Sequence, residues 1–483
     1  MRPIEALLLL ANLSTFATLA VPRLRRLLWA RYLAIFALLI VGAQTVVEGP
    51  RWQMFPAYAL SGLFALAFLP PVAKRHEAIR FHRLAAGLST AFAVLALAIS
   101  AALPMAFPVF QFPRPHGPYG IGTLTYHWVD AGRPEIFTAD PNDHRELMVQ
   151  IWYPAKGGHD LKRAPYVHDG ATLAPLARLL HLPGFVLGHL KYVMTNAIPS
   201  APVADGAASY PVLMSLHGRG GYRQENTFQI EELVSNGYIV ADIDQPYAAA
   251  TVAFPDGRLA AFDTRMIDRR FEDGMIPYLS RDVTFALDQL ASLNNTDENG
   301  ILTGRLDLLR VGILGVSLGG EVSAEACLRD PRLRACLSMD VWMPPDVVQA
   351  GLRQPTMWIS RDAGTMRLEG WSEAVTDETL GTMRRVFEEL PGDGYLVRVR
   401  GMFHADFSDA PLLSPLTSWL GITGPIDPAR ALRIVSAYSL AFFDRHLKDR
   451  PAALLDGPAE RFPEVLFETR RHSLASAQGN TGL

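Results

Sequence analysis

The sequence contains very little cysteine and no large excess of charge of either sign. Cys327 and Cys336 are the two cysteines in 483 residues, which excludes a disulfide-rich scaffold and a four-cysteine zinc site. The formal net charge is −3, which argues against a nucleic-acid-binding protein. Charged residues make up 19% of the chain and hydrophobic residues 49%, a composition that excludes intrinsic disorder. The sequence shows no internal repeat.

Hydrophobicity and positive charge are concentrated in residues 1–113. This part holds ten Lys/Arg and three Asp/Glu, although the whole chain is net negative. It also contains four long apolar stretches, and a helix needs about 20 apolar residues to cross a bilayer. We therefore expect a transmembrane helical domain of about four spans at residues 1–113. The stretches are Ala6–Val21, which is marginal, Leu27–Val47, Trp52–Ala73 and Leu84–Phe112.

The charges between these stretches predict their orientation. Connections on the cytoplasmic side carry an excess of Lys and Arg. The first and third connections are rich in these residues, and the second connection and the N-terminus hold one each. We therefore expect a multi-pass protein of a bacterial inner or plasma membrane, with its C-terminal part on the extracytoplasmic side. The basic residues are Arg23, Arg25 and Arg26, then Lys74, Arg75, Arg80 and Arg83.

Strand-like and helix-like segments alternate from residue 114 to 450. Such alternation predicts a mostly parallel sheet covered by helices on both faces, with ligands at the carboxyl ends of the strands. No strand is expected after the helix Ala429–Leu447, and residues 451–483 are expected to form a loosely ordered tail. The other expected helices are Thr227–Asn236, Ser280–Leu293 and Glu321–Leu328. The expected strands are Thr123–Trp128, Glu146–Tyr153, Tyr210–Leu216, Tyr238–Asp242, Arg310–Gly315, Arg334–Met339, Thr356–Ser360 and Tyr395–Val399.

A glycine-rich turn around Ser317 indicates a catalytic nucleophile. The segment GVSLGG follows the strand RVGILG and precedes a helix, which is the G-x-S-x-G pattern in a strand–turn–helix context. A serine needs a base, and His404 in GMFHADFSD follows a later strand. The alternatives are His446, on an amphipathic helix, and His472, in the polar tail.

Two aspartates compete to orient that histidine. Asp340 ends the first strand after the turn, and Asp362 follows the next strand, so the chain order serine–acid–histidine fits both. Spacing alone slightly favours Asp362. The oxyanion donors are expected to be the backbone N–H groups of Leu318, directly after the serine, and of Arg219, in the turn LHGRGG.

The part of the chain from about Pro118 to Lys448 resembles the platelet-activating factor acetylhydrolase family (plasma and type II enzymes), with its bacterial dienelactone-hydrolase-like and polyester-hydrolase relatives. The segments that carry this resemblance are MVQIWYP, LHGRGGYRQ, GVSLGG, LSMDVWMPP, GMFHADFSD and YSLAFFDRHL. The resemblance implies an α/β-hydrolase fold and ester hydrolysis through an acyl-enzyme. It favours Asp340 over Asp362 as the acid and matches His404, Leu318 and Arg219 to the family's residues. The apolar N-terminal part is a departure from the familiar animal enzymes.

The expected substrate is a lipid or short-acyl ester, and neither a cofactor nor a metal is expected. Trp342 and Met343 are expected to line the acyl pocket, with a core role as the alternative. The insertion Leu173–Val193 is expected to form a lid or an interfacial contact. The sequence does not decide whether Cys327 and Cys336 form a disulfide, which an extracytoplasmic location would allow. The rival functions are a catalytically silent membrane scaffold or receptor, and an acyltransferase that uses the same residues.

Overall fold

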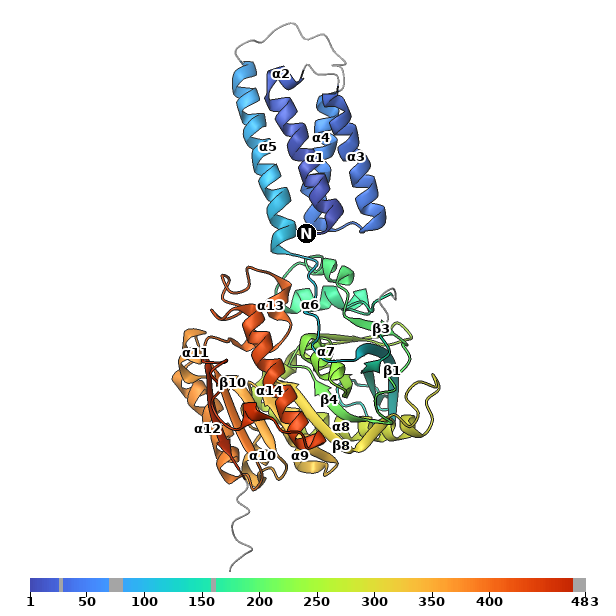
Figure 1. The fold of residues 1–483 in the computed structure, drawn as a ribbon, viewed down its shortest axis with the longest axis vertical. Helices are drawn as coiled ribbons and strands as arrows, with labels where there is room; N and C mark the ends of the chain where they lie inside the picture. Colours follow the sequence, from blue (N-terminus) through green and yellow to red (C-terminus); the bar gives the residue numbers. More distant parts are fainter. Residues whose placement is uncertain (26–28, 69–80, 158–161, 472–483) are drawn as a thin grey trace, which may run out of the picture. The chain divides into compact units, whose positions relative to one another are not determined.

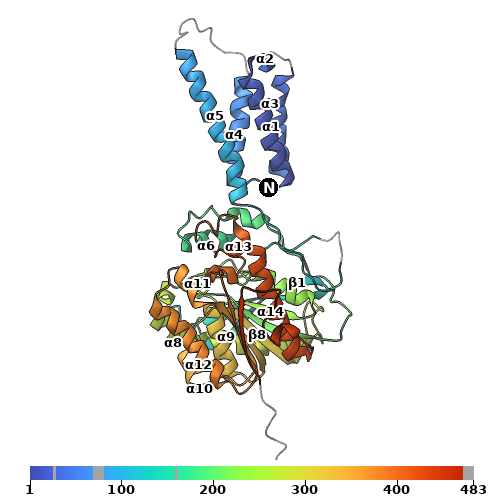
Figure 2. The ribbon, with the colours of Figure 1, turned by 60° about the vertical axis from the view of Figure 1, so that its left-hand side comes forward.

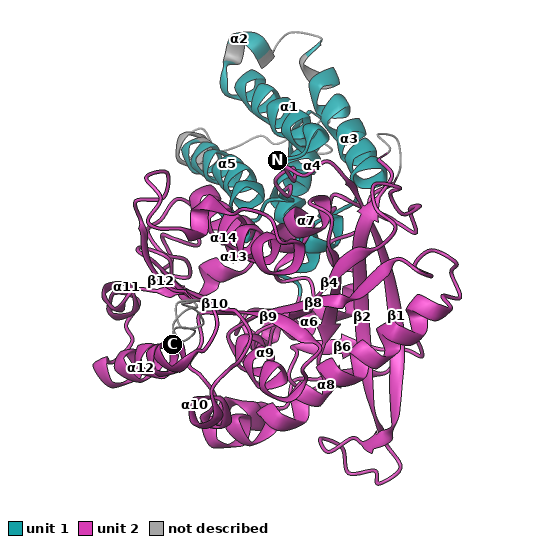
Figure 3. Ribbon diagram, turned by 60° about the horizontal axis from the view of Figure 1, so that its bottom comes forward, with its two compact units in different colours: residues 1–110, 185–193, 413–416 teal, residues 111–184, 194–412, 417–483 magenta. Residues whose placement is uncertain are grey.

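The computed structural model describes residues 1–25, 29–68, 81–157 and 162–471. The chain divides into two compact units, drawn in different colours in Figure 3. The smaller unit comprises residues 1–110, 185–193 and 413–416, and the larger unit comprises residues 111–184, 194–412 and 417–483.

The smaller unit is a group of helices that pack side by side (Figure 1). Several of its polar groups are buried. Arg51 forms an ion pair of 2.6 Å with Glu5, and both side chains are fully buried. The Asn12 amide donates to the carbonyl of Ala57 at 2.9 Å and accepts from Ser61 at 2.8 Å. The helices are α1 (Pro3–Ala20), α2 (Pro22–Arg25), α3 (Ala30–Val47), α4 (Phe55–Ala67) and α5 (Phe81–Ala106).

Large apolar side chains of this unit lie exposed. Among the described residues, two helical stretches are long and apolar enough to cross a membrane, Pro3–Ala20 and Gly87–Ala106, and Tyr32–Val47 is apolar but shorter. The expected span Trp52–Ala73 is represented by a helix that ends at Ala67, and residues 69–80 lie outside the described part. Four spans are therefore not confirmed. The exposed side chains include Ile35, Leu39 and Val46 of α3 and Leu88, Phe92 and Leu95 of α5.

The larger unit is built on a ten-stranded sheet in the order β12-β11-β10-β9-β8-β4-β5-β2-β1-β3. The six strands from β5 to β11 in that order are parallel, and β2 and β12 run antiparallel at either side of them. The strands are β1 (Gly120–Pro134), β2 (His144–Ala155), β3 (Ala197–Pro199), β4 (Tyr210–Leu216), β5 (Ile239–Asp244), β8 (Leu306–Val316), β9 (Leu333–Met339), β10 (Thr356–Arg361), β11 (Gly394–Val399) and β12 (Val465–Arg470). A separate hairpin pairs β6 (Thr251–Ala253) with β7 (Leu259–Ala261).

Helices cover both faces of this sheet, as alternation along the chain predicts. Figure 2 shows α8, α9, α10 and α12 on one side of the strands and α14 on the other. Buried aliphatic residues of β4, β8, α8 and α9 form one continuous core. The helices are α6 (Leu173–Leu179), α7 (Thr227–Ser235), α8 (Arg269–Asn295), α9 (Leu318–Arg329), α10 (Pro345–Ala350), α11 (Ala363–Leu368), α12 (Glu373–Glu389), α13 (Ala410–Leu413) and α14 (Pro428–Lys448).

The structure differs from three expectations about the larger unit. A strand does follow α14, because β12 pairs antiparallel with β11 from Val465↔Val399 to Arg470↔Gly394. The tail expected to be loose from residue 451 is therefore ordered as far as this strand, and residues 472–483 lie outside the described part. Helix α8 begins at Arg269, eleven residues before the expected start, because the Asp268 carboxylate accepts from the N–H groups of Arg270 and Phe271 and caps it.

Strand β12 contributes an aromatic contact that should stabilise the larger unit. The Phe467 ring stacks on Tyr438 of α14 at 5.9 Å and lies 6.3 Å from Tyr395 of β11. We expect Phe467→Ala to lower the free energy of unfolding by about 2 kcal/mol, less than for a fully buried ring because Phe467 is half-buried. Thermal and urea unfolding of the full chain in detergent measure this effect. Thr469→Ala, at an exposed position of the same strand, is the control, and equal losses in both variants would contradict a specific role for the ring.

Candidate active site

Ser317 occupies a strained turn between β8 and α9. Its φ is 52° and its ψ is −128°, and its N–H donates to the carbonyl of Met339 at 2.9 Å. An L-residue adopts such a φ only where the surrounding structure enforces it. The serine therefore stands at the carboxyl end of β8 and directly before the N-terminus of α9, where partial positive charge favours a developing oxyanion.

The two flanking glycines are needed because the backbone is crowded there. A Cβ on Gly315 would lie 2.2 Å from the carbonyl oxygen of Gly319, and a Cβ on Gly319 would lie 2.3 Å from that of Leu216. Real side chains do not tolerate such distances. The G-x-S-x-G pattern thus lets the start of α9 pack directly on the ends of β8 and β4.

The sheet register brings Asp340 next to Ser317. Val316 pairs with Met339 in the neighbouring parallel strands β8 and β9, so Ser317 and Asp340 are the next residues on adjacent strands. Adjacent strands lie about 4.8 Å apart. His404, in the loop after β11, comes to the same edge, and its Nδ1 lies 2.5 Å from Asp340 Oδ2.

Asp340 is fully buried but has several donors. Ser360 Oγ donates to Oδ1 at 3.0 Å, Arg361 Nε donates to the same oxygen at 3.0 Å, and Arg361 Nη2 lies 2.9 Å from Oδ2. Burial by itself raises the pKa of this carboxyl group. The Arg361 guanidinium, followed by the hydrogen bond with His404, outweighs burial and holds the pKa of Asp340 well below its usual range.

Arg361 is a partner of the site that the sequence patterns did not identify. It is fully buried, pairs with Glu369 as well as Asp340, and lies 4.0 Å from the centre of the Trp371 ring. Glu369 accepts from the backbone N–H of His404 at 3.2 Å, so Arg361 links the carboxylate to the backbone of the histidine loop. Its position directly before Asp362, at the end of a strand, is the only signal in the sequence.

The serine and the histidine do not form a hydrogen bond in this structure. Within residues 1–25, 29–68, 81–157 and 162–471, His404 bonds through Nδ1 to Asp340, and no bond joins its ring to Ser317. The His404 side chain is 36% exposed, so part of its ring is accessible from outside the protein. Catalytic hydrogen bonds of this kind often tighten when substrate binds.

The turn after β4 lies against Ser317. A Cβ on Gly218 would lie 3.3 Å from the serine Cβ. The Gly218 carbonyl accepts from His217 Nδ1 at 2.7 Å, because His217 Nε2 is occupied as acceptor of the Gln245 N–H at 3.1 Å. This carbonyl and the Arg219 N–H belong to one trans peptide and point in opposite directions. His217 therefore fixes the direction of the Arg219 N–H. Across the described chain, neither this N–H nor that of Leu318 donates to a protein acceptor.

Carboxylates surround the base of this turn. Glu225 accepts from the Gly218 N–H, and burial raises its pKa. Glu272 forms an ion pair of 2.8 Å with Arg219, and burial raises its pKa to about 7. Glu321, in the first turn of α9, is buried, and burial together with Glu272 raises its pKa well above the usual value. A protonated Glu321 would leave the N-terminus of α9 free of a competing negative charge.

Asp362, the alternative acid, has a different role in the structure. It caps α11, accepting from the Gly364 N–H at 3.1 Å and from the Thr365 hydroxyl, and has no bond to His404. The side chains of the two expected pocket residues have different surroundings. The Arg269 guanidinium stacks on Trp342 at 4.6 Å, whereas Met343 is 2% exposed in the core and its sulfur accepts from Trp358 Nε1.

The remaining sequence expectations concern the insertion Leu173–Val193, the two cysteines and metal binding. The insertion Leu173–Val193 is divided between the two units after Gly184, and in the larger unit a Cβ on Gly220 would lie 2.6 Å from the Leu179 side chain of α6. Cys327 and Cys336 are buried free thiols, not a disulfide. Among the described residues, no group of three His, Cys, Asp or Glu side chains could hold a metal ion.

The comparisons with known proteins point to one chemistry. A family model described as "Platelet-activating factor acetylhydrolase, isoform II" matches residues 287–456. The platelet-activating factor acetylhydrolase of Cavia porcellus is 23% identical over 396 residues, covering 75% of this chain and 85% of the relative. A probable 1-alkyl-2-acetylglycerophosphocholine esterase of Arthroderma benhamiae is 24% identical over 408 residues, covering 78% of this chain and 97% of the relative.

A solved structure agrees with these relatives. The ferulic acid esterase from Streptomyces cinnamoneus is 29% identical, has a TM-score of 0.61, and covers 74% of this chain and 99% of its own. The larger unit thus has an α/β-hydrolase fold, and the chain is an ester hydrolase. The expected resemblance to the platelet-activating factor acetylhydrolase family is confirmed.

The contacts of the two aspartates predict different effects of their substitution. Asp340→Asn should lower kcat/KM for a p-nitrophenyl ester by about 10³- to 10⁴-fold, because an amide cannot hold the histidine in the required tautomer. Asp362→Asn should change kcat/KM less than about threefold, because asparagine caps a helix as well as aspartate does. Initial rates of the two purified variants decide between them. A deeper loss in Asp362→Asn would assign the acid to position 362.

Proposed function

We propose that the chain is a serine carboxylic-ester hydrolase in which Ser317, His404 and Asp340 are the catalytic residues. Ser317 Oγ attacks the ester carbonyl while His404 Nε2 accepts its proton. The backbone N–H groups of Leu318 and Arg219 bind the oxyanion of the tetrahedral intermediate. His404 then gives the proton to the leaving alcohol, and the acyl group stays on Ser317.

Water completes the cycle by the same route. His404 takes a proton from the water that attacks the acyl-enzyme, and returns it to Ser317 as the carboxylic acid leaves. Asp340 orients the ring through Nδ1 and stabilises the imidazolium during both steps. The reaction needs neither a metal nor an organic cofactor, because each proton moves between groups of the chain, the substrate and water.

The hydrogen bond of 2.5 Å between His404 Nδ1 and the buried carboxylate of Asp340 is the observation that carries this proposal. Ser317 directly follows β8, the strand that pairs with β9 before Asp340, and its φ is 52°. The hydrogen bond from His217 to the Gly218 carbonyl sets the direction of the Arg219 N–H. A silent scaffold would not need a strained serine beside an ionised carboxylate and histidine.

The proposed substrate is a lipid ester or an ester of a short acyl group. One relative is named as an acetylhydrolase of platelet-activating factor, and another as a probable esterase of 1-alkyl-2-acetylglycerophosphocholine. Half-exposed Trp342 and the apolar helix α6 offer apolar surface in the larger unit. We propose a phospholipase A2-type reaction on such esters, with hydrolysis rather than transfer to a second alcohol.

We further propose that residues 1–113 anchor the enzyme in a membrane through about four spans and that residues 114–450 form the catalytic domain. The buried polar groups and exposed apolar side chains of the smaller unit support this proposal, since a bilayer reverses the usual preference of protein surfaces. The distribution of Lys and Arg supports an extracytoplasmic catalytic domain. Anchoring would hold the enzyme at a high local concentration of lipid esters.

Replacement of the serine tests the proposed mechanism. Ser317→Ala should lower kcat for p-nitrophenyl esters by at least about 10³-fold, because the loss of the nucleophile leaves only binding and the oxyanion donors. Esters of graded chain length, assayed on the full chain in detergent, also define the preferred acyl group. The thermal midpoint of the variant checks its fold, and retained activity in a folded Ser317→Ala protein would contradict the mechanism.

Labelling of single cysteines tests the membrane proposal. Leu309→Cys lies at an 82% exposed position of the larger unit, and Arg23→Cys lies in the first connection. In intact cells with an accessible extracytoplasmic face, an impermeant maleimide should label Leu309→Cys at once and Arg23→Cys only after permeabilisation. The wild-type chain, whose two thiols are buried, is the control. The opposite pattern would reverse the proposed orientation.

A further inference from the structure

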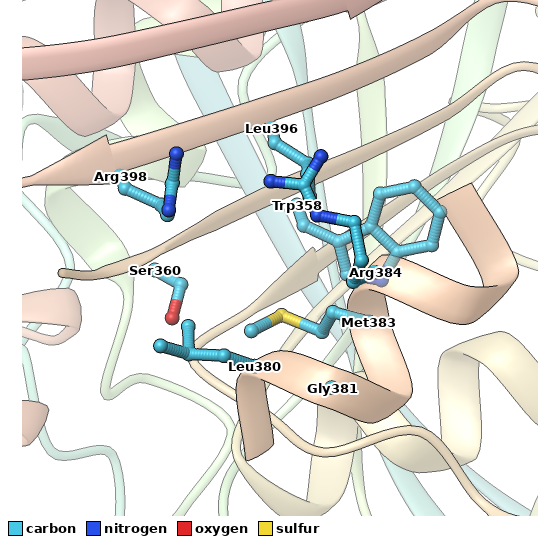
Figure 4. Close-up of a pocket in the computed structure, with 8 residues that line it drawn as sticks. All are labelled: Trp358, Ser360, Leu380, Gly381, Met383, Arg384, Leu396 and Arg398. Carbon is cyan, nitrogen blue, oxygen red and sulfur yellow. The ribbon is translucent and has the colours of Figure 1, made fainter. Parts of the chain in front are cut away.

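A cavity of about 220 Å³ lies between β10, β11 and α12 in the larger unit (Figure 4). One part of its wall is apolar and is formed by Trp358, Leu380 and Met383. The other part is polar and is formed by Ser360, Arg384 and Arg398. None of the proposed catalytic residues lines this cavity.

The positive charge at the cavity is only partly balanced. Arg384 donates to both oxygens of Glu468 in β12, at 2.7 and 2.8 Å, and Arg398 Nη2 donates to one of the same oxygens. The two guanidinium groups therefore share one close carboxylate. Glu388 lies 4.0 Å from Arg384 Nε, but its side chain is 63% exposed and screened by water.

One donor at this cavity has no acceptor. Arg398 Nε is buried and has no hydrogen-bond partner anywhere in the described part of the chain. A buried N–H of a charged group without an acceptor is costly, and native proteins rarely leave one unmatched. A bound anion would supply the missing negative charge at the accessible part of this guanidinium group, whose side chain is 27% exposed.

We propose that this cavity binds a small monocarboxylate with a short apolar tail. The planar carboxylate would accept from the guanidinium group of Arg398, for which its geometry is suited. The tail would lie against Trp358, Leu380 and Met383, where a fully hydrated anion such as phosphate would lose water without gaining partners. Binding of this ligand does not depend on the proposed hydrolysis.

The cavity is also connected to the proposed catalytic acid. Ser360 lines the cavity, and its hydroxyl donates to Asp340 Oδ1 at 3.0 Å. Ser360 therefore contacts both the carboxylate of the proposed active site and the ligand space. A carboxylate in the cavity would compete for the same hydroxyl proton, so the site is placed where a carboxylic acid could affect turnover.

Calorimetric titration of the full chain in detergent with butanoate tests the binding site, with butanamide as the uncharged control. The matched variants are Gly381→Ala and Gly381→Phe in α12, because Gly381 lines the cavity and a Cβ there meets no atom within 4 Å, which leaves a phenyl group room to occupy ligand space. We expect Gly381→Ala to bind butanoate with an affinity within about threefold of wild type. Gly381→Phe should bind butanoate at least about tenfold more weakly, and wild type should bind butanamide at least about tenfold more weakly than butanoate.

Arg398→Lys provides a second variant that keeps the charge but removes the Nε donor. It should weaken butanoate binding by about tenfold while its thermal midpoint confirms a folded chain. Equal butanoate affinity in Gly381→Phe and Gly381→Ala would place the ligand elsewhere and overturn the proposal. Equal affinity for butanoate and butanamide, or no detectable binding to wild type, would overturn it as well.

Discussion

The structure of the site depends on keeping a buried carboxylate ionised at the edge of the sheet. The side chain of Asp340 is fully buried, and burial alone would favour its neutral form. Arg361 removes this difficulty with a permanent charge 2.9 Å from Oδ2, and Ser360 and the Arg361 Nε satisfy the other oxygen. Once the carboxylate is ionised, the ring of His404 has one favourable orientation, with Nδ1 toward Asp340. The position of the remaining histidine nitrogen follows from that orientation.

Crowding of the backbone provides the second constraint. The elbow at Ser317 works only if α9 starts within contact of the ends of β8 and β4, and the Cβ distances at Gly315 and Gly319 show that no side chain fits between them. The same crowding places the turn after β4 on the serine. The position of both proposed oxyanion donors is thus a consequence of packing, because neither N–H belongs to a side chain that could move independently.

The sequence predicts those residues of the site that belong to a short motif or follow a recognisable strand. The turn around Ser317 is recognised because the glycines are required within two residues of the serine. Asp340 and His404 are recognised by chain order and by resemblance. Arg361 and the hydrogen-bond pattern of His217 were not predicted, because each depends on partners more than 20 residues away. The fold was predicted for the central strands, but β12 was missed because it lies within a segment rich in Ala, Gly, Pro and Ser, and its apolar residues gain a partner only by pairing with β11.

The shared use of Asp340 Oδ2 by His404 and Arg361 has a consequence for how the site would work. A carboxylate that already balances a guanidinium offers less negative charge to an imidazolium than a free carboxylate does. The contribution of Asp340 would then lie more in fixing the tautomer and orientation of His404 than in charge stabilisation. Arg361 also contacts Glu369, which holds the backbone N–H of His404, so the guanidinium stabilises both ends of the histidine's position. Orientation maintained from two directions can compensate for reduced charge, because a misplaced base loses more than a slightly weaker one.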